Sequence, residues 1–232
     1  MAGHLLAAVV LTTLLVPFVP PSRQLELRQR WSARLLKILG IRLSTDAPFV
    51  GPGSLIVANH VSWLDIFVIN AAFPTTFVSK AEVREWPLAG WLAARHETVF
   101  LRRGSRGHAR IVNGEIAALL AEGRHVTVFP EGTTTDGSHV LGFHGALLQA
   151  AIEAKAPLQP IAIAYRQPDG QYTRAPAYDG DLSLLDSLRA IVAEPQITAR
   201  LRVGEPLSVI DTPDRKTLAH QARECIVAGI AD

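Results

Sequence analysis

Residues 55–69, LIVANHVSWLDIFVI, decide the fold because a strand pattern changes to a helix pattern within this stretch. LIVAN is a short apolar run typical of a buried strand, and apolar residues at helical spacing follow it over 63–72. His60 and Asp65 interrupt these apolar runs. In one continuous helix, residues five apart point about 140° away from each other, so these side chains can meet only across a strand-to-helix turn.

Asp65 has two interpretations at such a turn. Ser62 followed three residues later by Asp65 resembles a capping box, in which Asp65 only stabilises the start of a helix expected from Trp63. Alternatively, the carboxylate reaches the His60 imidazole, fixes its tautomer and stabilises its charged form, as a histidine general base requires. The spacing alone does not choose between the two.

The rest of the chain alternates strand patterns with helix patterns. This alternation predicts an α/β fold with a mostly parallel sheet flanked by helices, where ligands bind at the C-terminal ends of strands. A length of 232 residues with 48% hydrophobic residues suffices for one large core. Strands are expected at 54–59, 75–80, 97–103, 125–130, 158–165 and 199–209, helices at 63–72, 86–94, 107–121, 184–193 and 214–229, and a surface loop over 167–186.

Composition excludes several classes of protein. A net charge of +2 is too balanced for a nucleic-acid binder. The single cysteine, Cys225, excludes an intramolecular disulfide framework, and we expect it in the core, in a reducing compartment. A metal hydrolase would have to use His60, Asp65, Glu131 and His144. Since His-Glu-x-x-His and paired-cysteine spacings are absent, we expect no metal.

The N-terminal region points to a membrane. An apolar run over 5–19 lacks the features of a signal peptide and is shorter than the roughly 20 residues of a spanning helix, so spanning and entering one leaflet both stay open. Leu27, Trp31, Leu35 and Ile38 then recur at helical spacing among basic residues, which predicts a helix in the headgroup region. The alternative is that both helices pack on the domain.

We therefore expect 1–43 to form membrane-associated helices and 44–232 to form the globular domain. The residues that follow the apolar run are strongly basic, and positive charge at this position would keep the domain at the cytoplasmic face of the inner membrane. The basic residues are Arg23, Arg28, Arg30, Arg34, Lys37 and Arg42, against Glu26 alone.

Polar residues follow the other predicted strands as they follow LIVAN. Lys80 ends one strand, Arg102 and Arg103 end the next, and Glu131, Gly132 and Thr133 come directly after another. Taken singly, each has an ordinary explanation as a surface ion pair or a turn. Because the C-terminal ends of parallel strands share one edge of a sheet, together they indicate an anion-binding and catalytic site.

These motifs resemble the glycerolphosphate acyltransferase family, and within it the 1-acylglycerol-3-phosphate acyltransferase branch. The resemblance covers about 52–163 and rests on NHVSWLD, VFLRR and FPEGT, in that order, with a less specific apolar segment around Pro160. It implies that His60 is the catalytic base and Asp65 orients it. It further implies that Arg103 and Lys80 hold the acceptor phosphate, and that Glu131, Gly132 and Thr133 shape the acceptor site. Arg102, beside Arg103, is a further candidate for substrate binding.

The implied reaction moves an acyl group from acyl-CoA or acyl-carrier protein to the free hydroxyl of a lysophospholipid at a membrane lipid surface, with no cofactor. Such a hydroxyl is too weak an acid to ionise unaided, so a base such as His60 is needed. Gly-x-Ser-x-Gly is absent, which favours direct transfer over a serine acyl-enzyme. The backbone around Gly132 is the candidate oxyanion donor.

Two departures from the family pattern bear on the acceptor. Thr134 stands where the family commonly has arginine, and Arg102 stands where an acidic residue is more usual. EGTTTDG resembles the branch that includes lyso-ornithine lipid acyltransferases. We expect 1-acylglycerol-3-phosphate, giving phosphatidic acid, ahead of a lyso-aminolipid, and a non-catalytic membrane-binding module is the alternative outside the class.

Overall fold

The computed structural model describes residues 18–46, 53–85, 90–91, 95, 98–102, 106–212 and 214–231. Most of the apolar run over 5–19, most of the helix expected at 86–94, and Arg103 lie outside the described residues. The helices are α2 (Pro21–Ile38), α3 (Asp65–Ala72), α5 (Arg106–Ala121), α6 (Gln149–Ala154), α7 (Leu184–Ala193) and α8 (Arg215–Ala231), with 3-10 turns η2 (Ala81–Glu85) and η3 (Gly145–Leu148). The strands are β1 (Ile41–Thr45), β2 (Leu55–Ala58), β3 (Thr76–Lys80), β4 (Val99–Leu101), β5 (Val126–Val128), β6 (Leu158–Arg166) and β7 (Ile197–Val203).

The described strands form a seven-stranded sheet in the order β1-β7-β6-β2-β5-β3-β4. Strands β6, β2, β5, β3 and β4 run parallel, while β7 is antiparallel to β6 and parallel to β1. The predicted α/β fold with a mostly parallel sheet is therefore confirmed. Strand β2 lies between β5, which ends beside it, and β6, which continues past the end of β2 to Arg166.

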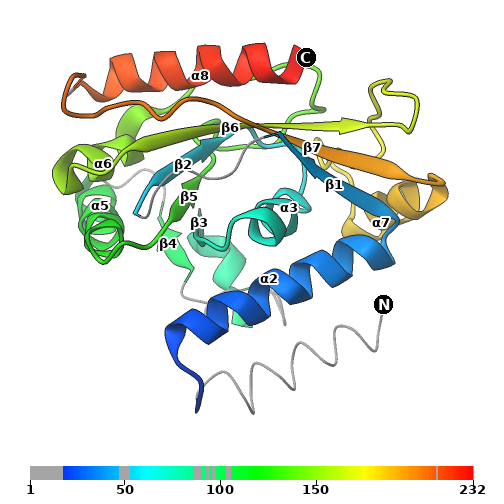
Figure 1. Cartoon of the computed structure of the whole chain (residues 1–232), viewed down its shortest axis with the longest axis horizontal. Coiled ribbons are helices and arrows are strands. Elements are labelled where there is room, and N and C mark those ends of the chain that lie inside the picture. The colour runs from blue at the N-terminus through cyan, green and yellow to red at the C-terminus, as the bar shows by residue number, and fades with distance from the viewer. Residues whose placement is uncertain are drawn as a thin grey trace.

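The sheet has a hydrophobic core on each face, and β2 contributes to both because alternate side chains of a strand point to opposite faces. Leu55 and Val57 pack with residues of α5, α6 and α8, whereas Ile56 and Ala58 pack with residues of α2, α3 and α7. Figure 1 shows α8 covering one face of the sheet and α3 the other, with α2 outside α3.

Several elements differ from the sequence prediction. Helix α3 begins at Asp65 and not at Trp63, because residues 63–64 form a turn that precedes it. Strand β7 covers Ile197–Val203 and not 199–209. Strand β1 was not predicted because only Ile41 among its side chains is buried, which leaves little apolar pattern. The predicted domain boundary between 43 and 44 falls inside β1.

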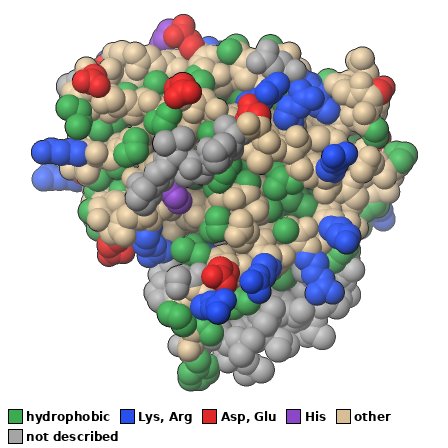
Figure 2. Space-filling model, in the orientation of Figure 1, with side chains coloured by type: hydrophobic (Ala, Val, Ile, Leu, Met, Phe, Trp, Pro, Cys, Tyr) green, Lys and Arg blue, Asp and Glu red, His purple; other side chains and the backbone are tan. Residues whose placement is uncertain are grey.

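Much of the apolar side of α2 packs on the domain, which is the alternative that the sequence left open, while contact of this helix with a membrane stays a prediction. Leu35, Leu36 and Leu39 are at most 4% exposed, and the Trp31 ring lies 5.5 Å from that of Phe67 in α3. The helix instead exposes basic side chains, which form a row along it in Figure 2. No helix in the described part of the chain is long and apolar enough to cross a bilayer.

Candidate active site

The structure brings His60 and Asp65 together at the turn between β2 and α3. The His60 Nδ1 atom lies 2.8 Å from Asp65 Oδ2, and the Asp65 side chain is fully buried while that of His60 is 21% exposed. The chain reverses over 59–64, so a carboxylate in the first turn of α3 reaches back to the strand end. The partly exposed imidazole is thus held by a carboxylate that solvent does not reach.

Asp65 bonds to backbone N–H groups as well as to His60. Its Oδ2 atom also accepts hydrogen bonds from the backbone N–H groups of Val61 and Ser62, at 2.7 and 2.9 Å. The Ser62 hydroxyl accepts from the N–H of Leu64 at 3.2 Å. Backbone donors therefore hold the Asp65 carboxylate together with the imidazole. The pairing with His60 is present, whereas the expected capping box of a helix from Trp63 is not formed, since α3 begins at Asp65 without a side-chain cap.

The His60 ring is held on its flat side by an aromatic stack. Its centroid lies 4.1 Å from that of Phe129, with 13° between the planes, and Phe129 in turn stacks 6.2 Å from Phe77 of β3. A proton on Nδ1 is shared with Asp65, which leaves the Nε2 lone pair as the basic position. This arrangement of ring, carboxylate and free nitrogen is that of a histidine general base.

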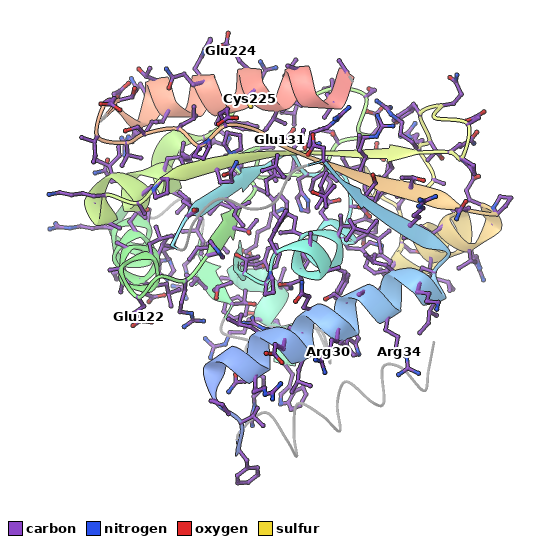
Figure 3. All side chains as sticks on the ribbon, in the orientation of Figure 1. Arg30, Arg34, Glu122, Glu131, Glu224 and Cys225 are labelled. Carbon is purple, nitrogen blue, oxygen red and sulfur yellow. The ribbon has the colours of Figure 1, made fainter. Side chains whose placement is uncertain are left out.

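Glu131 supports the same turn from β5. It is 4% exposed, and its Oε1 accepts from the His60 N–H at 2.7 Å while its Oε2 accepts from the Leu141 N–H at 2.7 Å. Figure 3 shows Glu131 in the middle of the molecule, whereas Glu122 and Glu224 lie at its periphery. Burial raises the pKa of Glu131, against the lowering effect of its two backbone hydrogen bonds. Its carboxylate thus connects the backbone at His60 to the backbone at Leu141.

Gly132 and Thr133 form the turn after Glu131. Gly132 has a φ of 71°, a conformation that favours glycine, and its N–H donates to the Phe129 carbonyl at 3.0 Å. The Gly132 N–H is thus already bonded, and an oxyanion donor from the backbone around Gly132 stays a prediction. Thr133 is exposed beside it.

The next residues connect the turn at His60 to a distant loop. The Thr134 hydroxyl donates to the Tyr178 carbonyl, and the Tyr178 N–H donates to the Val61 carbonyl at 2.9 Å. The Thr135 N–H donates to the His60 carbonyl at 2.9 Å. We call residues 132–139 and 172–179 the acceptor rim, because both segments bond to the backbone around His60 or to each other.

The predicted phosphate-binding cations lie at neighbouring strand ends. Lys80 ends β3 in register with Leu101 of β4, and Arg102 follows directly. Both side chains are exposed, and the Arg102 N–H donates to His108 Nδ1 at 3.1 Å. Lys80 and Arg102 therefore lie side by side at the C-terminal ends of two parallel strands, as predicted.

Sequence reasoning missed two residues that hold the site, Asn59 and Tyr165. The Asn59 side chain pairs with both backbone groups of Ile163 in β6, at 2.7 and 2.9 Å. Tyr165, also in β6, donates from its hydroxyl to Asp65 Oδ1 at 2.7 Å. In the sequence, Asn59 and Tyr165 stand out only as polar side chains within apolar strand patterns. Such a pattern does not show which residue each side chain would bond.

The metal alternative finds no support among the residues that the structure describes, since they contain no group of three or more His, Cys, Asp or Glu side chains placed to hold a metal ion. Glu131 is occupied by backbone N–H groups. His144 is exposed, and its N–H donates to the Pro130 carbonyl at 2.9 Å.

Comparison with known proteins gives a consistent set of relatives. A family model described as Acyltransferase matches residues 40–164. The lyso-ornithine lipid O-acyltransferase of Pseudomonas aeruginosa is 43% identical over 210 residues, which cover 90% of this chain and 79% of that protein. The 1-acyl-sn-glycerol-3-phosphate acyltransferase of Neisseria meningitidis is 35% identical over 194 residues, which cover 84% and 76%.

A solved structure has the same fold. The crystal structure of the 1-acyl-sn-glycerophosphate acyltransferase from Thermotoga maritima superposes with a TM-score of 0.71, covering 99% of this chain and 94% of the other at 21% identity.

Proposed function

The chain belongs to the acyltransferase family as an O-acyltransferase of lysolipid-type acceptors, and we propose that its preferred acceptor carries an ornithine-type headgroup. This proposal reverses the order expected from the motifs, in which 1-acylglycerol-3-phosphate stood first. The observation that carries it is the environment of Thr134.

His60 acts as the base in a direct transfer between the two substrates. Its Nε2 takes the proton of the acceptor hydroxyl as the oxygen attacks the thioester carbonyl. The new C–O bond forms, the tetrahedral intermediate collapses, and the C–S bond breaks. The departing thiolate takes the proton from His60, so the histidine is regenerated without a covalent enzyme intermediate. We propose acyl-CoA or acyl-carrier protein as the donor.

Thr134 makes the acceptor rim unlike a phosphate site. Its hydroxyl is bonded to the Tyr178 carbonyl, and residues 132–140 contain neither lysine nor arginine. The rim instead carries charges of both signs, with Arg174 paired to Asp179 at 2.7 Å and Asp136 nearby, since the Tyr172 hydroxyl bonds to the Asp136 carbonyl at 2.6 Å. An ornithine headgroup carries one ammonium and one carboxylate, which opposite charges on the protein can match.

Phosphatidic acid formation is the second candidate because Lys80 and Arg102 lie at adjacent strand ends. Two exposed cations on one edge can bind a phosphate, and the relative from Neisseria meningitidis is named for a phosphate-bearing acceptor.

The deciding experiment measures thiol release from an acyl-CoA by purified protein in detergent, with lyso-ornithine lipid and 1-acylglycerol-3-phosphate as competing acceptors. We expect kcat/KM to favour the ornithine acceptor, with both activities lost in His60→Ala. A preference for 1-acylglycerol-3-phosphate would establish the second candidate and overturn the first.

A Thr134→Arg variant tests the reason for that preference. The new cation should raise kcat/KM for 1-acylglycerol-3-phosphate relative to the ornithine acceptor by about tenfold, the size of one exposed charge-assisted contact. Thr134→Val is the matched control, because it removes the same hydroxyl without adding charge. Equal ratios in the two variants would mean that residue 134 does not read the headgroup.

We also propose that the outer face of α2 contacts an anionic membrane at the cytoplasmic face of the inner membrane. Arg30 and Arg34 point away from the sheet (Figure 3), and the Arg30 side chain is 76% exposed. Each basic residue near an anionic surface contributes about 1 kcal/mol. Arg30→Glu with Arg34→Glu should therefore reduce co-flotation with vesicles that contain phosphatidylglycerol and leave binding to purely zwitterionic vesicles unchanged. Equal flotation of variant and parent protein would exclude this face.

A further inference from the structure

Tyr165 contacts the Asp65 partner of His60 from the sheet. It is the residue before the last of β6 and is 3% exposed, and its hydroxyl donates to Asp65 Oδ1 at 2.7 Å. We propose that Tyr165 is a positioning residue for acyl transfer, which acts through Asp65 to set both the orientation and the basicity of His60.

The two oxygens of Asp65 are held in different ways. Oδ2 receives three donors, from His60 Nδ1 and the N–H groups of Val61 and Ser62, and all three belong to the turn itself. Oδ1 receives its donor from β6, which is remote in sequence. Tyr165 is thus the contact that ties the carboxylate to the sheet.

The backbone of Tyr165 is fixed on both sides. It pairs with Ala199 of β7 in the antiparallel ladder, and its carbonyl accepts from the Thr173 N–H at 3.3 Å. Asp65 lies instead at the start of a helix, where the chain has fewer constraints. The contacts run from Tyr165 through Asp65 to His60. The strand fixes the position of Tyr165, and the substrate would contact His60 at Nε2.

Tyr165 is also a donor of constant charge. Burial, together with the neighbouring Asp65 carboxylate that its hydroxyl bonds, raises the pKa of Tyr165 well above 10, so the phenol stays protonated. A neutral donor draws negative charge from the carboxylate oxygens. Loss of this donor would leave Asp65 a stronger partner for imidazolium, so His60 would hold its proton to higher pH.

A purely structural hydroxyl makes a different prediction. Removing a buried hydrogen bond of that kind lowers the free energy of unfolding but leaves the pH dependence of turnover unchanged. Thr127 supplies the comparison, because it is also fully buried, in strand β5 of the same sheet, and its hydroxyl bonds to that of Thr75 at 3.0 Å. Thr127→Val therefore removes one buried hydroxyl outside the site.

The test compares Tyr165→Phe with Thr127→Val in the full chain, using the better acceptor of the unaltered protein. For Tyr165→Phe we expect kcat to fall about tenfold, the acceptor KM to change less than twofold, and the rising limb of kcat/KM to move to higher pH. For Thr127→Val we expect kcat, the acceptor KM and the pH profile of kcat/KM to stay as in the parent. A Tyr165→Phe variant with the parent's pH profile, or with the same kcat as Thr127→Val, would overturn the proposal.

A second measurement does not depend on turnover, so it separates this proposal from the choice of acceptor. Nitrogen NMR of 15N-histidine-labelled protein, with the His60 signals assigned from His60→Gln, reports which ring nitrogen carries the proton. We expect the protonated Nδ1 form in the parent and shifted His60 ring-nitrogen signals in Tyr165→Phe. Identical His60 spectra in the two proteins would show that Tyr165 does not act on the histidine.

Discussion

Two helices of this molecule start with the same Ser-x-x-Asp pattern and serve different purposes. At α7, Ser183 accepts from the Asp186 N–H at 3.2 Å, and the Asp186 side chain is 54% exposed beside Arg189. At α3, Asp65 is fully buried between His60 and Tyr165. The same four-residue pattern yields a simple helix cap before α7 and a partner for the proposed general base before α3. The difference arises from what the sheet brings to each helix start.

The largest effect should come from removing the base. His60→Ala should lower kcat by about 10³-fold or more with the fold retained, since general base catalysis contributes up to about 10⁴. The position five residues before Asp186 is Asp181, which is exposed, so Asp181→Ala should keep full activity. Thiol-release kinetics together with thermal melting check both variants. Comparable activity of His60→Ala and Asp181→Ala would remove the catalytic distinction between the two helix starts.

The second effect compares the two aspartates directly. Asp65→Asn should lower kcat by about 10³-fold because a neutral amide neither stabilises the imidazolium nor enforces one tautomer. It should also cost about 1–3 kcal/mol of unfolding free energy, since a buried amide cannot accept every donor now directed at the carboxylate. Asp186→Asn should leave kcat unchanged and cost less than about 1 kcal/mol. Steady-state kinetics and urea titrations of both variants measure the contrast.

A third change weakens a support that α3 has and α7 lacks. Glu131→Gln should lower kcat by about tenfold and cost about 1–3 kcal/mol, because one of the two N–H groups of His60 and Leu141 would face an amide donor. The pKa of Glu131 is raised by burial, so the folded chain holds this proton more tightly than the unfolded chain.

The sign of the pH effect follows from that shift. A raised carboxyl pKa contributes stability below its ordinary value of 4.5, and this contribution is lost as the pH rises through the folded-state pKa. The difference in unfolding free energy between the parent and Glu131→Gln should therefore shrink with rising pH above about 4.5. Urea titrations at several pH values test this. If the difference in unfolding free energy instead grows over the same pH range, the pKa of the Glu131 carboxyl is not raised in the folded chain.

The contrast between the helix starts also explains what the sequence could predict. Strand-helix alternation was enough for the α/β fold, and the predicted turn after LIVAN brought His60 and Asp65 within reach of each other as one of two interpretations. Both are local or periodic features of the chain. The hydrogen bond from the Tyr165 hydroxyl to Asp65 joins residues that are 100 apart in the sequence. The hydrogen bond between Asn59 and Ile163 joins residues that are 104 apart. Such pairings depend on strand order, which periodicity does not contain.

The sequence left two interpretations of α2 open for a related reason. Its apolar residues have the spacing of a helix on a membrane surface, but that spacing is equally the spacing of a helix packed on a core. Leu35 and Leu36 pack in the core beside α3 residues, and the basic residues remain outside. An amphipathic pattern indicates that a helix has an apolar partner and does not say which one.

The smallest effect on turnover should come from replacing the serines before the two helices, Ser62 and Ser183. Ser183→Ala removes an exposed cap and should cost about 1 kcal/mol with no change in kcat. Ser62 is fully buried, so Ser62→Ala leaves the Leu64 N–H without its acceptor in a place that water does not reach, and about 1–3 kcal/mol is expected. Because Asp65 keeps its own bonds to the N–H groups of Val61 and Ser62, kcat should fall only a few fold in Ser62→Ala. Thermal melts and kinetics of both variants give the comparison. A loss of turnover in Ser62→Ala as large as in Asp65→Asn would mean that the cap, and not the carboxylate, holds the histidine.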